Sequence, residues 1–264
     1  MKFGILGYGY VGKATHKGLI KELQPDCTIL SKEVCVYDIG IDEEIVDVYG
    51  NSIPNIKEDL YKCDAVFICI PTNTDEDITT VMKEIRSIKS LCEKDIIIRS
   101  TLPIGATERI KSEVGDRVIY IPEFLRERFW DTDCMKRPLV VGCDYNTLPK
   151  WLQEEDHIHV STVEAEMIKM FSNNYGVVRI AYANVFYDIA QKLGANYDKI
   201  VDAYFQVGPK QTYMDVPGHD GSRGFGGKCL PKDLDFLINS LDNLSLNHEW
   251  FKTIRELNKS WTKN

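Results

Sequence analysis

Short apolar runs alternate with longer amphipathic segments over residues 1–160. Segments such as Thr79–Leu91 and Thr107–Val114 have the composition and length of helices. Alternation of this kind predicts an α/β fold with a doubly wound parallel sheet, because apolar strands require cover on both faces. The predicted strands are Lys2–Leu6, Val34–Tyr37, Ala65–Ile70, Asp95–Arg99, Arg117–Ile121, Leu139–Gly142 and His157–Val160.

The pattern changes after Ser161. Residues from Thr162 to Leu193 form one segment without proline, and Gly194 follows as a predicted C-terminal stop. A single helix of this length would be about 50 Å long, so it would link two domains or pack against a second copy. Two shorter helices broken near Gly176 are the alternative. Apolar residues recur on one stripe at helical spacing, namely Val163, Met167, Phe171, Val178, Val185 and Ile189.

The remainder of the chain is also predicted to be helical. Helices are expected over Tyr197–Gln206, Pro231–Ser240 and Asn247–Lys259, with a loop rich in Gly, Pro and Asp between the first two. The chain has 264 residues, 44% of them hydrophobic and 27% charged, which excludes a disordered or fibrous protein. We therefore expect a sheet domain over residues 1–160 and an all-helical domain, built on the long central helix, over residues 161–264.

Charge and cysteine content restrict the function further. A formal net charge of −8 argues against nucleic-acid and anionic-membrane partners, since both bind basic surfaces. The sequence has no run of about 18 apolar residues and no signal-peptide pattern. The eight cysteines form no C-x-x-C pair and no zinc spacing, so we expect a reduced, cytoplasmic protein without a metal site. We interpret seven of them as small buried side chains and treat Cys229 separately.

The segment from Gly7 to Gly12 follows the first strand and opens a helix. Its sequence, Gly7-Tyr8-Gly9-Tyr10-Val11-Gly12, is a G-x-G-x-x-G pattern in the context that binds a dinucleotide pyrophosphate. Asp38 ends the next strand, where a carboxylate accepts hydrogen bonds from ribose and repels a 2′-phosphate. This favours NAD over NADP, although the gap to Asp38 exceeds the usual spacing of about 20 residues. The alternative is an ordinary glycine-rich turn.

Polar residues stand where three strands are predicted to end. The segments are Ile70–Thr74, Ser100–Gly105 and Pro122–Glu127. Ligands of doubly wound sheets bind outside the carboxyl ends of strands, so these segments are candidates for cofactor and substrate contacts. Taken singly, each is also compatible with ordinary loop chemistry.

Lys169 and Asn173 lie one turn apart on the predicted long helix, off the apolar stripe. A lysine can act as acid or base or stabilise an oxyanion, and an asparagine can position a hydroxyl or a water. The alternative is a solvated helix face.

Cys229 stands just after the glycine run Gly224–Gly227 and near a predicted helix N-terminus. That placement beside Lys228 and Lys232 lowers the pKa of a thiol and activates it as a nucleophile. Asp233, one turn later, could orient a base or a water. An inert buried thiol would stand more naturally in an apolar run.

Together these segments resemble the UDP-glucose/GDP-mannose dehydrogenase family. The matching segments occur in family order over nearly the whole chain, and P-E-F-L-x-E with G-F-G-G-x-C-x-x-K-D is a specific combination. The resemblance implies a Rossmann-type NAD domain and NAD-dependent four-electron oxidation of the C6 alcohol of a nucleotide sugar to a uronate. It also implies a homodimer formed through the central helix.

The resemblance implies a role for each matching residue. Cys229 would form a thiohemiacetal and then a thioester. Lys169 and Asn173 would stabilise the substrate oxygen, and Asp233 would assist proton transfer with a water. Glu123 would act as acid or base in thioester hydrolysis, helped by Thr101 and Glu127. The implied cofactor contacts are Gly7, Gly9, Tyr10, Val11, Gly12, Asp38, Pro71, Thr72, Ser100, Thr101 and Glu127, and the implied substrate contacts are Glu123, Phe124, Leu125, Arg126, Lys169, Asn173, Tyr213, Phe225, Gly226 and Gly227.

The chain departs from the family pattern in several places. Family members usually continue into a second nucleotide-binding domain that holds the nucleotide of the substrate, so we expect a short form without it. The loop Tyr213–Arg223 looks longer than the commonest version, and Lys210 stands near where an arginine often reaches a neighbouring subunit's substrate. Two other functions remain open: a two-electron hydroxyacid dehydrogenase of the 6-phosphogluconate dehydrogenase type, and a non-catalytic NAD-binding subunit.

Overall fold

A computed structural model describes residues 1–20, 34–42, 44–89, 94–135, 138–144, 148–153, 155–207, 215–245 and 247–262. The candidate residue Tyr213, like Lys210, lies outside these ranges. The chain divides into two compact units, Met1–Lys169 and Met170–Asn264. Within the described ranges, no helix combines the length and the hydropathy needed to cross a bilayer.

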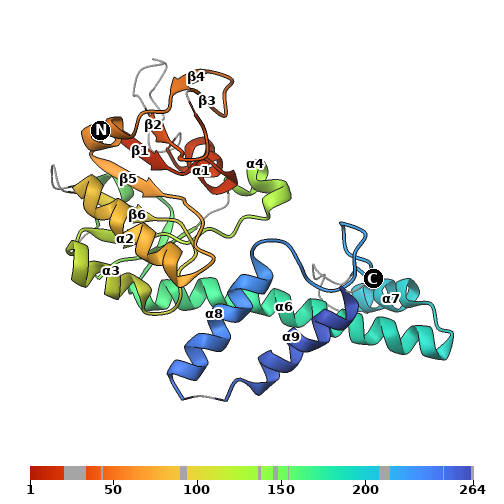
Figure 1. Cartoon of the computed structure of the whole chain (residues 1–264). Helices are drawn as coiled ribbons and strands as arrows, with labels where there is room; N and C mark the ends of the chain where they lie inside the picture. The colour runs from red at the N-terminus through yellow and green to blue at the C-terminus, as the bar shows by residue number, and fades with distance from the viewer. Residues whose placement is uncertain are drawn as a thin grey trace. The chain divides into compact units, whose positions relative to one another are not determined.

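The first unit is built on a seven-stranded sheet (Figure 1). Its order is β2-β1-β5-β6-β7-β8-β9, so the order reverses at β1, where β2 lies on one side and β5 on the other. In doubly wound sheets this reversal opens the crevice that binds the ligand. The strands are β1 (Phe3–Leu6), β2 (Val34–Tyr37), β5 (Ala65–Ile68), β6 (Asp95–Ile98), β7 (Val118–Tyr120), β8 (Leu139–Gly142) and β9 (His157–Val160).

One edge of the sheet corrects the prediction of an entirely parallel sheet. The strands from β2 to β7 pair in parallel, but β8 runs antiparallel to β7, with the single registered pair Tyr120↔Gly142. Strand β9 then pairs in parallel with β8. The described residues between β7 and β8 form the short helices η3 (Glu127–Phe129) and α4 (Trp130–Asp133). Antiparallel neighbours need no crossover helix across the sheet face, which is consistent with this short connection.

Helices cover the sheet and bury two apolar clusters. Helices α2 (Asp75–Lys89) and α3 (Ala106–Val114) pack against one face, where Ile85 and Ile110 meet strand residues such as Ile98. The other face buries Phe3, Phe67 and Ile97 with Leu152 of α5 (Lys150–Gln153). The predicted α/β fold is thereby confirmed. Smaller elements complete the unit, namely α1 (Tyr10–Ala14), η1 (Thr15–Ile20), η2 (Lys57–Lys62) and the hairpin β3 (Glu44–Val46) and β4 (Ser52–Pro54).

Helix α6 (Thr162–Leu193) is continuous, so the alternative of a break near Gly176 is not observed. Ser161 and Glu164 form a capping box at its start, with the Ser161 amide donating to Glu164 Oε2 at 2.8 Å. Ala165 and Ile168, in the first two turns, pack in the core of the first unit. The helix ends before Gly194, whose φ of 67° is the left-handed conformation of a helix stop.

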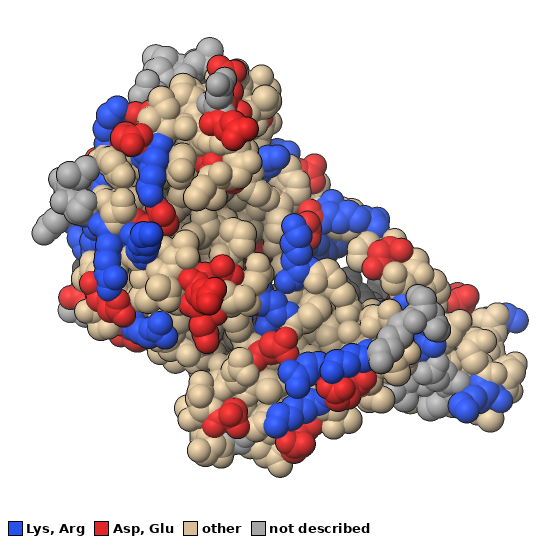
Figure 2. All heavy atoms as spheres, viewed as in Figure 1, with Lys and Arg blue, Asp and Glu red and all other residues tan. Residues whose placement is uncertain are grey.

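The second unit contains helices beyond the start of α6. These are α7 (Tyr197–Val207), α8 (Leu230–Asn243) and α9 (Glu249–Trp261). Val177 and Ala181 of α6 pack with Leu234 of α8 and Ile254 of α9. On the face drawn in Figure 2, acidic and basic side chains are interspersed over both units. Some pair directly, as Lys57 does with Glu84 at 2.5 Å.

Candidate active site

The glycine-rich turn between β1 and α1 fits a dinucleotide. Gly7 has a φ of 91°, and a Cβ there would lie 2.7 Å from the Cys69 carbonyl oxygen. A Cβ on Gly12 would collide with the Gly7 carbonyl, so both positions require glycine. By contrast, space is open around Gly9, where a Cβ would meet no atom within 4 Å. A pyrophosphate can therefore approach the backbone at Gly9, Tyr10 and Val11, which open α1.

Asp38 follows β2 and is held beside this turn. Its Oδ2 accepts the Tyr8 amide at 2.6 Å, and its Oδ1 accepts the Gly40 amide at 2.8 Å. Asn55 fixes the Asp38 backbone by donating to its carbonyl at 2.8 Å and accepting its amide at 2.8 Å. Each carboxylate oxygen keeps a lone pair for a ribose hydroxyl, so Asp38 fits the adenosine ribose of NAD.

Tyr8, inside the glycine-rich turn, is a supporting residue that the sequence analysis missed. Its buried hydroxyl lies 2.7 Å from His16 Nδ1 and accepts the Val48 amide at 3.2 Å. Burial raises the pKa of Tyr8 and lowers the pKa of His16. Tyr8 thus connects the turn to the β3–β4 hairpin. Tyr8 occupies an x position of the G-x-G-x-x-G pattern, where any residue is allowed, so the pattern did not indicate this role.

The loops after β5 and β6 are tied to each other. Thr72 Oγ1 donates to the Thr101 carbonyl at 2.5 Å, and Ser100 Oγ donates to the Ile70 carbonyl at 2.7 Å. Thr72, Ser100 and Thr101 are buried, whereas Pro71 is exposed. The structure therefore brings together the polar strand-end residues that the sequence predicted as cofactor contacts.

Glu123 and Lys169 form a buried ion pair. Lys169 Nζ lies 3.1 Å from Glu123 Oε1 and donates to the Glu123 carbonyl at 2.6 Å. Only 3% of either side chain is exposed. Glu123 Oε2 accepts the Leu125 amide at 2.6 Å, and the Phe124 ring centre lies 5.6 Å from Lys169 Nζ. The interpretation of Lys169 as part of a solvated face is therefore wrong.

Arg126 and Glu127 differ in how they are held. The Arg126 guanidinium donates to both carboxylate oxygens of the buried Asp133 at 2.9 Å and lies over the Phe129 ring. This fork fixes the segment that carries Glu123, since bidentate pairs constrain both partners. Glu127 begins η3 and is exposed.

Asn173, Cys229 and Asp233 lie in the second unit. Asn173 Nδ2 donates to Asp233 Oδ2, and the neighbouring Asn174 donates to the Asp233 carbonyl at 3.4 Å. Asp233 is fully buried, and its amide donates to the Cys229 carbonyl at 2.9 Å. Cys229 is the N-cap residue of α8 and is half-buried.

The glycine run before Cys229 is anchored on α9. The Phe225 amide donates to Asn258 Oδ1 at 2.7 Å, and Asn258 Nδ2 donates to the Phe225 carbonyl at 2.8 Å. Phe225 is buried, while Gly226 and Gly227 are exposed with open space around them. No sequence signal pointed to Asn258, which acts here through the fold of the loop.

The described residues contain no group of three or more His, Cys, Asp or Glu side chains arranged to hold a metal ion. The chemistry available within them is that of a thiol at a helix start, a buried lysine–glutamate pair and an asparagine–aspartate pair. Lys169 and Asn173 stand one turn apart on α6, as the sequence spacing predicted.

Known proteins resemble most or nearly all of the chain. A UDP-glucose 6-dehydrogenase of Campylobacter jejuni is 28% identical over 291 residues, which cover 98% of this chain and 72% of that protein. A UDP-N-acetyl-D-mannosamine dehydrogenase of Methanocaldococcus jannaschii is 31% identical, covering 75% of this chain and 49% of that protein. The solved structure of a UDP-D-ManNAc dehydrogenase from Pyrococcus horikoshii shares the fold, with a TM-score of 0.75 and 21% identity over 99% of this chain and 69% of that one.

Two family models account for almost all of the sequence. The NAD binding domain of the UDP-glucose/GDP-mannose dehydrogenase family matches residues 1–154, where the glycine-rich turn and Asp38 lie. The central domain of the same family matches residues 163–260, which carry Lys169, Asn173, Cys229 and Asp233. The chain therefore belongs to the UDP-glucose/GDP-mannose dehydrogenase family of NAD-dependent oxidoreductases.

Proposed function

We propose that this protein oxidises the C6 hydroxymethyl group of a UDP-glucose-like nucleotide sugar to a carboxylate, reducing two NAD per sugar. The observation that carries the proposal is the pairing of its polar residues along α6. Lys169 forms an ion pair with the buried Glu123. One turn later on α6, Asn173 donates a hydrogen bond to Asp233, which follows Cys229 by one turn of α8. Two hydride transfers without release of an aldehyde require a covalent tether, and a thiolate is a suitable nucleophile.

The first oxidation converts the alcohol to an aldehyde. Bound NAD would supply the hydride acceptor in both oxidations. Asp233 and a water take the hydroxyl proton, while Lys169 and Asn173 donate hydrogen bonds to the substrate oxygen as its negative charge develops. The backbone at Gly9 and the carboxylate of Asp38 hold the cofactor.

The second oxidation takes place on a covalent adduct. The Cys229 thiolate attacks the aldehyde carbon, a C–S bond forms, and the carbonyl becomes a thiohemiacetal oxyanion that Lys169 and Asn173 stabilise. This adduct becomes a thioester when its carbon gives up the second hydride.

Hydrolysis completes the reaction. A water adds to the thioester carbonyl and gives a proton to Glu123, helped by Thr101 and Glu127; the C–S bond breaks and Cys229 leaves as thiolate. Two contacts support Glu123 as the base, because Lys169 holds Oε1 and the Leu125 amide holds Oε2. One alcohol, one water and two NAD⁺ thus yield one carboxylate, two NADH and three protons.

The test follows NADH absorbance with a panel of UDP-glucose, UDP-N-acetylmannosamine and GDP-mannose, using free sugar phosphates as controls. We expect two NADH per sugar consumed with at least one of them, and loss of uronate formation in Cys229→Ala. Cys134→Ala serves as the matched control, since Cys134 is a buried cysteine of the first unit that the proposed reaction does not use.

Two outcomes would overturn the proposal. One NADH per substrate, with turnover unchanged in Cys229→Ala, would indicate the two-electron hydroxyacid dehydrogenase. NAD binding without turnover of any substrate would indicate a non-catalytic subunit.

We also propose that the protein is a homodimer formed along α6. Large apolar side chains of this helix are exposed, including Phe171 at 76%, Tyr182 at 56% and Met167 at 53%. Exposed apolar stripes of this kind mark association surfaces, because a lone chain leaves them in water. Tyr175 and Phe186 extend the same stripe.

A further inference from the structure

Helix α3 begins without a cap of its own. Its N-cap residue is Gly105, which has no side chain to accept a hydrogen bond, and its φ is 87°. The first amides of a helix lack partners within the helix and are usually satisfied by a Ser, Thr, Asp or Asn at this position. The start of α3 therefore needs an acceptor from elsewhere in the chain.

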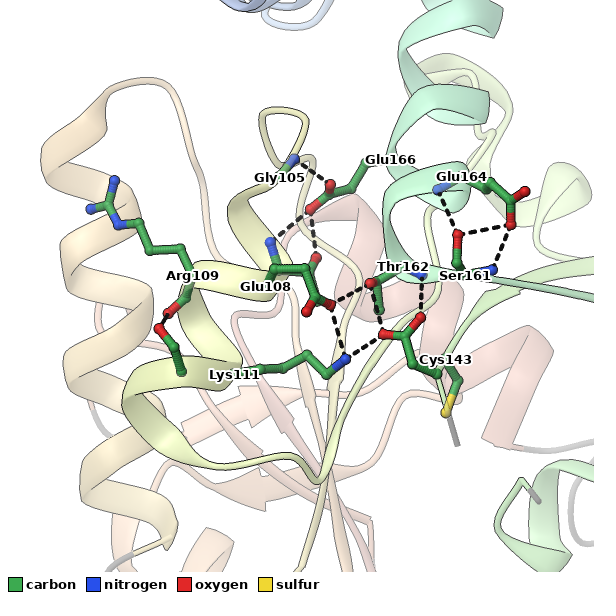
Figure 3. A network of polar contacts seen from close by, with 12 residues as sticks. Gly105, Glu108, Arg109, Lys111, Cys143, Ser161, Thr162, Glu164 and Glu166 are labelled. Carbon is green, nitrogen blue, oxygen red and sulfur yellow. Dashed lines mark hydrogen bonds and ion pairs between the residues drawn. The ribbon is translucent and has the colours of Figure 1, made fainter. Parts of the chain in front are cut away.

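Glu166 of α6 supplies that acceptor (Figure 3). Its Oε2 accepts the Gly105 amide at 2.6 Å, and its Oε1 accepts the Thr107 amide at 2.7 Å and the Thr107 hydroxyl at 2.6 Å. The Glu166 side chain is fully buried. A buried carboxylate that accepts three donors is strongly oriented, and it also complements the positive end of the α3 dipole.

The two elements that Glu166 joins both carry candidate catalytic residues. The loop before α3 contains Thr101, whose carbonyl is held from the other side by Thr72 at 2.5 Å. Lys169 follows Glu166 by three residues on α6, so the two side chains leave neighbouring sides of the same helix. We propose that Glu166 is a positioning residue that caps α3 from α6 and thereby sets the place of Thr101 relative to Lys169.

A second set of contacts between α3 and the start of α6 confines the effect of a change at Glu166 to the loop 101–107. Lys111 of α3 donates to Glu108 at 2.9 Å and pairs with Asp144, and Thr162 Oγ1 lies 2.6 Å from Glu108 Oε1 (Figure 3). These contacts still join α3 to the start of α6 when Glu166 is changed. Loss of the Glu166 carboxylate therefore releases the loop 101–107 without separating the helices.

The kinetic consequence rests on the proposed function, whereas the loop contact can be measured without turnover. In Glu166→Gln, an amide nitrogen replaces one of the two side-chain oxygens, and this nitrogen cannot accept a hydrogen bond. We expect hydrogen exchange of the peptide spanning residues 101–110 to rise about tenfold, the factor that loss of one charge-assisted hydrogen bond gives. We expect kcat at about pH 8 to fall by a similar factor, because the loop that carries Thr101 is no longer fixed relative to Lys169.

Two controls separate positioning from loss of stability. Ile110→Val removes one buried methyl group from α3 without touching Glu166, so it lowers the melting temperature through packing alone. Glu164→Gln changes an exposed carboxylate two residues away on α6. Both should keep kcat within about twofold of the wild type, since neither contacts the loop. Thr107→Val removes only the hydroxyl donor and should give a smaller change in the same direction as Glu166→Gln.

The proposal is wrong if hydrogen exchange of the loop is the same in Glu166→Gln and the wild type. It is also wrong if Ile110→Val, with its melting temperature lowered as far as that of Glu166→Gln, loses as much kcat as Glu166→Gln does. Should Glu166→Gln fail to fold, the same comparison is made with Thr107→Val. If the wild type oxidises no nucleotide sugar, the proposed function fails, and the exchange measurement alone decides the role of Glu166.

Discussion

Asp38 is oriented before any cofactor binds, since its two oxygens accept the amides of Tyr8 and Gly40. We predict that Asp38→Asn weakens NAD binding by about tenfold, because a hydrogen bond to a charged group is replaced by a weaker one. NADP binding should fall less or rise, since the repulsion of the 2′-phosphate is removed. Titration calorimetry with both cofactors measures the two affinities.

Asp42→Asn is the matched control for this prediction. Asp42 is an exposed carboxylate four residues further along the same connection. It should leave both affinities unchanged. Equal losses of NAD and NADP affinity in Asp38→Asn would show that Asp38 acts only by supporting the turn.

The environment of Cys35 differs from that of the buried, inert side chain that the sequence predicted. Its registered neighbour on β1 is Gly4, and a Cβ on Gly4 would lie 3.1 Å from Cys63 Sγ. A hydrogen bond with Cys63 lowers the pKa of Cys35 to about 7, against the opposing effect of burial. The thiols therefore meet because the strand between them carries no side chain.

We predict that alkylation of Cys35 by iodoacetamide is half-maximal near pH 7 and that Cys63→Ala moves this midpoint towards the ordinary value of 9.0. The midpoint rises because the thiolate loses its donor. Cys63→Ser keeps a donor and serves as the control. Peptide mass spectrometry across pH identifies the modified residue, and an unchanged midpoint in Cys63→Ala would contradict the prediction.

At the scale of elements, the hydrophobic pattern predicted most helices and strands well. It located α6 at Thr162–Leu193, because a long apolar period and a glycine stop are local signals. It missed the β3–β4 hairpin, whose strands have three residues each and carry too short a pattern. It also missed the antiparallel pairing of β8, since the direction of an apolar run is decided by the chain around it.

The contact between α3 and α6 predicts a pH dependence of stability. Burial raises the pKa of Glu166 from 4.5 to about 7, against the hydrogen bonds from Thr107 and Gly105, and Glu108 adds to the rise. Between these pH values the folded protein holds a proton that the unfolded chain has released. Glu166 therefore makes its full contribution to the free energy of unfolding below the pKa of the unfolded chain, and this contribution is lost as pH rises through about 7.

Thermal unfolding of wild type and Glu166→Gln across this range measures the effect. The melting temperature of the wild type relative to the variant should fall as pH rises from about 5 to 7 and level off by about pH 8. Glu164→Gln should show no slope across this range, because hydrogen bonds from Ser161 lower the pKa of Glu164 below its ordinary value of 4.5, and its contribution is lost only as pH falls below that value. If the difference in melting temperature between the wild type and Glu166→Gln did not change with pH, Glu166 would not titrate in this range.

At the scale of the whole molecule, the exposed stripe of α6 predicts association. We expect light scattering to give twice the mass of one chain for the wild type at micromolar concentration. Phe171→Asp should give the mass of one chain, because a charge cannot be buried unpaired in an apolar interface. Ser172→Asp, an exposed change on the same turn but off the stripe, should remain dimeric. A monomeric wild type would contradict the proposed dimer.

The sequence by itself determined the family and the α/β class, and it predicted Cys229, Lys169 and Asn173 as site residues, because these depend on local patterns and spacing. The tertiary structure decided which groups meet. It paired Lys169 with Glu123, turned Arg126 onto Asp133, and placed Glu166 over the uncapped start of α3. These contacts join residues from 7 to 61 positions apart, and only the folded chain sets the distances between them.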